Sequence, residues 1–108
     1  MTTKNVRLAG PALLTNAAVT KYTTPASTVT VVQHIHVQNP TGAAVTFTMS
    51  IGADAAATRI YDAFSIAAGG VLDTFCKYVL NAGDTIQALA GTTNVMTLTI
   101  DGQELTPG

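Results

Sequence analysis

His34 and His36 are the side chains whose type and spacing come closest to a reactive site. They are the only histidines of the chain, and one residue separates them. Because alternate side chains of a β-strand point to the same face, the two imidazoles would lie about 6–7 Å apart, which suits two ligands of one metal ion. The residues from Val37 to Pro40 contain no carboxylate, and there is no third histidine. We therefore predict no metal site; His34 and His36 are the residues that would bind one, and otherwise they are expected on a polar or interface-facing strand surface.

Nucleophilic and cofactor motifs are also missing from the sequence. None of the serines, Ser27, Ser50 and Ser65, stands in a Gly-x-Ser-x-Gly elbow. Cys76, the single cysteine, lies in a strand-like run and is expected to be a small core residue. No glycine-rich segment is followed by the lysine and the helix of a phosphate loop. We expect no catalytic residue, no cofactor and no enzymatic activity.

The composition is poor in charge and limits the classes of partner. Charged residues make up 10% of the 108 residues, against about 25% in ordinary domains. The five basic residues are scattered and form no cluster that could neutralise phosphates: Lys4, Arg7, Lys21, Arg59 and Lys77. We therefore expect neither nucleic acid nor a membrane as a partner. So weakly charged a surface favours association with copies of the same chain and with other proteins.

No targeting segment is visible in the sequence. The N-terminus lacks a basic stretch followed by an apolar run, and no apolar segment approaches the roughly 20 residues that span a bilayer. With one cysteine, no disulfide can form within the chain. These features predict synthesis in a cytoplasm.

The elements that would position the histidines are β-strands. Between Val29 and Val37 the odd positions are mostly apolar, whereas the even positions include both histidines, so opposite faces are expected for the two sets. The segments 45–51 and 95–100 alternate in the same way. Strands are expected at roughly 18–23, 28–38, 44–51, 58–66, 71–80, 85–90 and 95–105.

Turn signals separate these strands at short intervals. Asn39-Pro40-Thr41-Gly42 predicts a tight hairpin, and Asp101-Gly102 predicts a turn near the C-terminus. Short strands at this spacing are typical of a sandwich or barrel. We predict an all-β fold: a single antiparallel β-sandwich, jelly-roll-like, with about seven to eight strands.

The first 17 residues differ from the rest of the chain. They contain Gly10-Pro11 and one short apolar patch that includes Leu13 and Leu14. We predict an extended N-terminal arm at 1–17 that contacts a neighbouring subunit, and a β-sandwich domain at 18–108. The residues expected at interfaces are Arg7, Leu13, Leu14, His34 and His36.

The order of strands and turns resembles that of a known group of proteins. The segments that carry the resemblance are Lys21-Tyr22-Thr23-Thr24-Pro25-Ala26, Ile35-His36-Val37-Gln38-Asn39, Val45–Gly52 and Leu80-Asn81-Ala82-Gly83-Asp84-Thr85-Ile86. The succession is similar to small structural proteins encoded in the virion gene blocks of tailed bacteriophages, including those of actinobacterial hosts. The resemblance covers about residues 8–105 and rests on structural residues.

The resemblance implies a β-sandwich accessory protein of a phage particle. The expected function is a capsid decoration protein that forms homo-oligomers, trimers in preference to pentamers, and binds the major capsid protein to stabilise the shell. The expected location is the virion, with the capsid surface favoured over the tail. The alternatives are a minor tail or baseplate protein that contacts the host surface, a carbohydrate-binding module and, more remotely, a cupin-like metalloenzyme.

Overall fold

The computed structural model describes residues 2–107, which form eight β-strands. Seven of them agree with the expected strands to within two residues at each end, and the eighth lies at the N-terminus. No helix in this described part of the chain is long and apolar enough to cross a membrane. The strands are β1 (Thr2–Leu13), β2 (Val19–Thr23), β3 (Val29–Gln38), β4 (Val45–Ile51), β5 (Arg59–Ile66), β6 (Val71–Leu80), β7 (Thr85–Ala90) and β8 (Thr97–Thr106).

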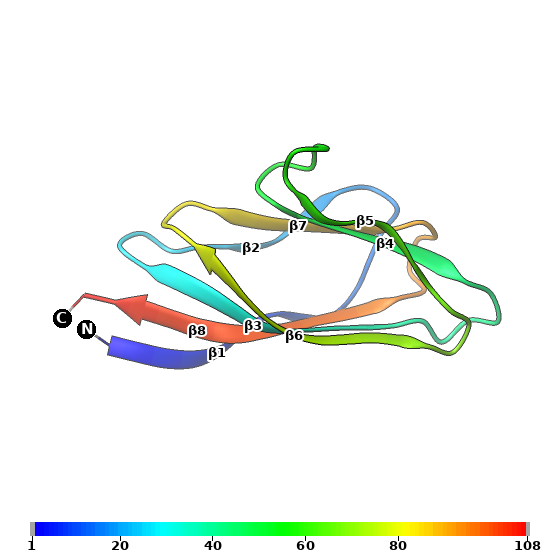
Figure 1. Cartoon of the computed structure of the whole chain (residues 1–108), viewed down its shortest axis with the longest axis horizontal. Helices are drawn as coiled ribbons and strands as arrows, with labels where there is room; N and C mark the ends of the chain where they lie inside the picture. The colour runs from blue at the N-terminus through cyan, green and yellow to red at the C-terminus, as the bar shows by residue number, and fades with distance from the viewer. Residues whose placement is uncertain (1, 108) are drawn as a thin grey trace.

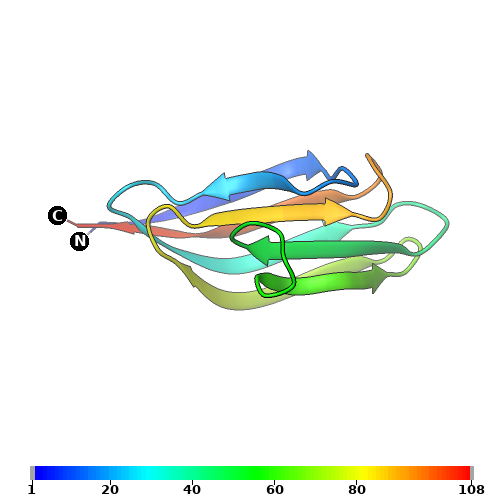
Figure 2. The ribbon, with the colours of Figure 1, turned by 90° about the horizontal axis from the view of Figure 1, so that it is seen from above.

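The strands form two four-stranded sheets that pack face to face. Sheet A has the order β1-β8-β3-β6 and sheet B the order β2-β7-β4-β5, and all neighbouring strands are antiparallel. Figure 1 shows sheet A as the lower layer and sheet B as the upper layer, and Figure 2 shows the strands of sheet B side by side from above. This strand order is that of an eight-stranded jelly roll. The expected antiparallel, jelly-roll-like sandwich is confirmed.

The N-terminal segment belongs to the sandwich and differs from the expected separate arm. Strand β1 pairs with β8 along its length, from Thr2 opposite Thr106 to Leu13 opposite Thr97. This pairing orders β1 within its own chain and satisfies the backbone groups on the side of β1 that faces β8, while the other side is a free sheet edge. The boundary expected at residue 17 is wrong for this reason, whereas contact of β1 with a neighbouring subunit stays a prediction.

Two expected turns take other forms in the structure. The segment that starts at Asn39 does not close a hairpin, because β3 and β4 lie in different sheets. The buried Asn39 amide instead donates to the carbonyls of Ala43 and Ile66, each at 2.9 Å. Asp101-Gly102 lies inside β8, where Gly102 is needed because a Cβ there would be 2.1 Å from the carbonyl oxygen of Val31. A glycine in a strand can thus mark a close backbone approach rather than a turn.

A β-bulge in β3 changes which residues face the core. Val32 pairs with Gly102 and His34 pairs with Asp101, which leaves Gln33 as an extra residue in β3. Beyond the bulge the odd residues point inward and the histidines outward, as expected, but before it the even residue Val32 is buried. The strict odd-and-even alternation expected for the whole strand is therefore wrong for its first half.

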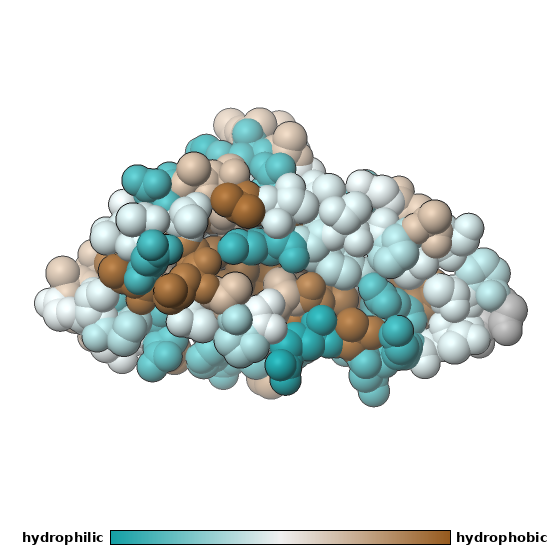
Figure 3. Space-filling view, turned by 180° about the vertical axis from the view of Figure 1, so that it is seen from behind, coloured by the Kyte–Doolittle hydropathy of each residue, from teal (hydrophilic) through white to brown (hydrophobic). Residues whose placement is uncertain are grey.

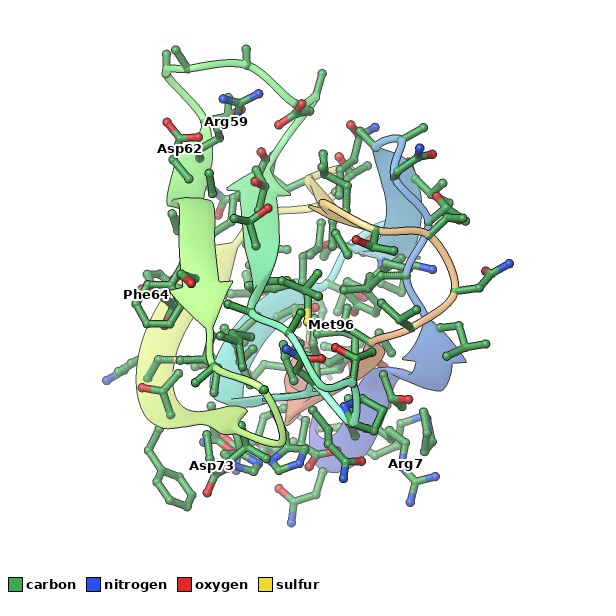
Figure 4. All side chains as sticks on the ribbon, turned by 90° about the vertical axis from the view of Figure 1, so that its right-hand side faces the viewer. Arg7, Arg59, Asp62, Phe64, Asp73 and Met96 are labelled. Atoms are coloured by element: carbon green, nitrogen blue, oxygen red, sulfur yellow. The ribbon has the colours of Figure 1, made fainter. Side chains whose placement is uncertain are left out.

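The core fills the space between the sheets. Met96 lies there in Figure 4, between the two layers. Phe47 and Met49 of β4 are fully buried, as are Leu98 and Ile100 of β8. The expected alternation is confirmed for β8, whereas β4 departs from it because Thr48 and Ser50 are buried as well. Burial of these apolar side chains is the main source of stability for so small a domain.

Candidate interaction face

The outer face of sheet A brings both histidines together with two carboxylates. His34 and His36 point outward from β3, and Asp73 reaches them from the neighbouring strand β6. One oxygen of Asp73, Oδ1, hydrogen-bonds His34 Nε2 and lies 3.3 Å from His36 Nδ1. Asp101 of β8 lies on the other side, with its Oδ2 at 3.7 Å from His34 Nδ1. No carboxylate follows the histidines in the sequence, and both acids come instead from paired strands that are distant along the chain.

The electrostatics of this cluster favour a charged carboxylate. Hydrogen bonds from His34 and then His36 lower the pKa of Asp73 below its ordinary value. Both imidazoles contact the same carboxylate oxygen, so the hydrogen bonds of this cluster are made among its own side chains. Among residues 2–107 no set of three or more His, Cys, Asp or Glu side chains has the arrangement of a metal site. The cluster can form hydrogen bonds and ion pairs with another molecule, because the two histidines and Asp73 are partly exposed to solvent.

Phe75 lies next to this cluster and is the most exposed large apolar side chain described. Its ring stacks on His34, with centroids 4.6 Å apart and planes inclined by 22°. Of the Phe75 surface 82% is exposed. An apolar ring that is held in place and left in water favours binding of another molecule on this face.

A shallow hollow of about 310 Å³ continues the face toward β1. Arg7 of β1, Gln33 of the bulge and Asp101 of β8 line it. Figure 4 shows Arg7 and Asp73 on the same, outward side of sheet A, toward opposite edges. The face therefore combines a cation, two carboxylates and an aromatic ring over the width of the sheet.

The remaining interface candidates fall in two different environments. Leu13 is half exposed at the end of β1, and Val19 of β2 is also exposed. Figure 3 shows the side of the molecule on which β1 and β2 lie, where hydrophobic side chains gather between the two layers. Leu14, in contrast, is fully buried, and its N–H donates to the carbonyl of Met96. Leu14 packs in the core of its own chain, so the expectation that it lies at an interface is wrong.

Sequence reasoning missed three residues of the face, Asp73, Phe75 and Asp101. The sequence gives no clear signal for Phe75, because apolar residues stand at both odd and even positions from Val71 to Val79 and do not show which face is outward. The two acids gave no signal either, because their approach to the histidines depends on strand pairing.

Cys76 has the environment expected from the sequence. It is half-buried against the core, and burial raises the pKa of its thiol. The thiol lies 3.6 Å from the carbonyl oxygen of Val32. A protonated, inward-facing thiol is a poor nucleophile, in keeping with a packing role.

No protein-family model matches the sequence of this chain. No curated protein matches it either.

Proposed function

We propose that this chain is a structural virion protein of a tailed phage, a capsid decoration protein that associates with copies of itself and with the major capsid protein. Its role is binding rather than catalysis. The minor tail or baseplate position is the alternative within the same particle.

The observation that carries the proposal is the exposed apolar row on β6. Phe75, Val71 and Val79 are 82%, 53% and 54% exposed, and they share the outer face of one strand. Asp73 and Lys77 lie on the same outer face, so a partner that covers these apolar side chains needs groups that pair with the two charges. The succession of strands and turns that resembles phage structural proteins supports the particle as the place where this happens.

The shape of the molecule also suits a lattice protein. Its extents are 49 × 24 × 19 Å, so the sandwich is long and thin. A long body laid on a repeating shell makes several modest contacts, and the lattice multiplies them. Self-association of the bound copies would stabilise the shell further.

The test is the copy number of the chain in purified virions of the phage that encodes it. Mass spectrometry with a labelled standard should find hundreds of copies per particle if the chain covers the shell. A handful of copies would support the tail position instead. Absence of the chain from purified particles, with the major capsid protein present, would contradict both.

A carbohydrate-binding module is the second candidate, and Phe75 favours it. Jelly rolls are also the fold of lectin domains, and an exposed ring on a flat sheet face is where a sugar ring stacks. A glycan array with wild-type protein and Phe75→Ala tests this function. Saturable binding that Phe75→Ala abolishes would support the module over the capsid role.

A further inference from the structure

Three of the four edge strands carry features that discourage pairing with another chain. Strand β1 contains Pro11 and two register shifts, and β2 is only five residues long. Strand β5 has two register shifts against β4, and Ala63 takes a positive φ of 50°. Bulges, prolines and short edges are the usual protections against strand addition. Strand β6 also has one register shift, against β3 between Phe75 and Tyr78, but among these edges it alone has ten residues with an unbroken alternation of burial.

The outer row of β6 is complementary to itself. From one end to the other it reads Val71, Asp73, Phe75, Lys77 and Val79. The aromatic residue is central, the two valines are at equal distance from it, and the two opposite charges are at equal distance from it. Two antiparallel copies paired about Phe75 would place each Asp73 opposite a Lys77 and each Val71 opposite a Val79.

We infer that two copies of this chain join through β6, in an antiparallel pair centred on Phe75, to form a continuous eight-stranded sheet. Pairing about Asp73 or about Lys77 would place like charges directly opposite each other, which is unfavourable. The Phe75 register is the one that pairs both charges with their opposites. The contact is isologous, so a twofold axis relates the copies.

The neighbouring groups fit this arrangement. Phe75 of each copy already stacks on His34, so the two Phe75 rings would meet as a cross-strand aromatic pair between two histidines. Asp73 uses Oδ1 for the histidines and has its second oxygen available for Lys77 of the other copy. The inward side chains Leu72 and Tyr78, both half-buried at present, would lie opposite each other and become covered.

Pairing through β6 rests on the self-association in the proposed function and specifies its geometry, but it is tested in solution and needs no virion. The trimer expected from the resemblance would use other surfaces of the molecule. If the chain proves monomeric in solution, the pairing fails, and the copy number in virions still tests the particle assignment. If the chain is absent from virions, the particle assignment fails, and the pairing in solution is still tested.

Charge complementation between two variants tests the pairing. Lys77→Asp leaves only acids in the row, and Asp73→Lys leaves only bases. Sedimentation velocity should show a concentration-dependent dimer for the wild type in the micromolar range. For each variant alone, the dimer dissociation constant should rise by roughly tenfold or more, because like charges replace two attractive contacts. An equimolar mixture of the two variants should recover the dimer.

The control is Val19→Lys, which adds a charge at an exposed valine of β2 and should leave the dimer unchanged. Circular dichroism melting of every variant confirms that it is folded. A wild type that stays monomeric throughout this range would overturn the inference. A mixture that dimerises no better than the separate variants would also overturn it.

Disulfide trapping tests the register independently of charge. In a Cys76→Ala background, Val71→Cys and Val79→Cys each introduce one thiol. On mild oxidation a mixture of the two should give crosslinked dimers in which the two variants are joined, because residues 71 and 79 are opposite. Neither variant alone should crosslink to itself. Equal crosslinking of Val71→Cys to itself would contradict the Phe75-centred register.

Discussion

Strands β5 and β6 are edge strands of opposite sheets, and they treat their free edges differently. Strand β5 is irregular: Ala63 has a positive φ, and Arg59 forms ion pairs with Asp54 and Asp62 beside it. Figure 4 shows Arg59 and Asp62 together at the start of β5. Strand β6 keeps its alternation of burial despite one register shift against β3, and it presents Phe75 to solvent. The two edges therefore differ in how readily another strand could pair with them. Charged side chains and a distorted backbone disfavour pairing at β5, whereas β6 can pair with another strand.

The largest expected effect comes from removing the core side chain beneath β5. Phe47 is fully buried, and its ring lies 5.7 Å from that of Tyr61 on β5. Phe47→Ala should reduce the free energy of unfolding by about 3–5 kcal/mol, measured by urea denaturation. Amide exchange should rise more in β5 than in β6, because Phe47 pairs with β5 in the sheet.

The matched control is Phe75→Ala, since Phe75 is exposed on β6. Its free energy of unfolding should change by less than about 0.5 kcal/mol at protein concentrations low enough to be monomeric. Similar losses for Phe47→Ala and Phe75→Ala would break the distinction between a supporting and a contacting phenylalanine.

A smaller effect is expected from the buried amide that anchors the end of β5. Asn39 donates to the carbonyl of Ile66, and its oxygen accepts from the N–H and hydroxyl of Thr41. Asn39→Ala should cost about 1–3 kcal/mol for a buried group left unpaired. Thermal melting measures the loss, and the exposed Asn81→Ala serves as the control. An unchanged melting temperature for Asn39→Ala would show that β5 is held without this anchor.

A gain in stability is expected from relieving the strain within β5. Ala63 has a φ of 50°, a conformation that glycine adopts at no steric cost. Ala63→Gly should raise the free energy of unfolding by about 0.5–1 kcal/mol. Ala43→Gly, in an exposed loop, should lower it. If Ala63→Gly were destabilised as Ala43→Gly is, the positive φ at Ala63 would not be a source of backbone strain in β5.

The smallest effects concern the carboxylates of the two edges. The pKa of Asp54 is lowered chiefly by hydrogen bonds from Arg59, and that of Asp73 chiefly by hydrogen bonds from His34. In carboxyl NMR titrations, Arg59→Gln should raise the pKa of Asp54 and leave that of Asp73 unchanged. His34→Gln should raise the pKa of Asp73 and leave that of Asp54 unchanged. A shift of both carboxyls in either variant would contradict two independent sites.

The sign of the pH dependence follows from these lowered pKa values. Each carboxylate contributes stability that is present above its ordinary pKa and is lost as the pH falls through the lowered one. The wild type should therefore lose stability in acid, and Arg59→Gln should lose less. Urea midpoints between neutral pH and about pH 3 measure the difference.

The strands were predictable because alternation of apolar and polar residues is a local property. The segments 71–80 and 85–90 were placed with their observed ends because turn residues bound them on both sides, at 68–70, 81–84 and 91–94. Strand β1 was missed because its polar residues and Pro11 give no alternating pattern, and only its pairing with β8 orders it. The phase change at Gln33 was missed because a bulge leaves the residue types of the strand unaltered.

The candidate face was only partly predictable. The outward direction of His34 and His36 follows from the strand itself and is confirmed. Their contact with Asp73 depends on which strand lies beside β3, and that is decided by the packing of the whole sandwich. Leu14 shows the converse, since an apolar residue near a terminus was taken for surface and is core.

The pairing of Thr2 with Thr106 places the two ends of the described chain side by side, and Figure 1 shows them at one tip of the long body. A linker of a few residues could therefore close the backbone into a ring, and new ends could be opened in the loop between β4 and β5. Cargo fused at the original tip would project along the long axis and leave β6 uncovered. The molecule is thus suited to circular permutation and to display of fused domains in a defined direction.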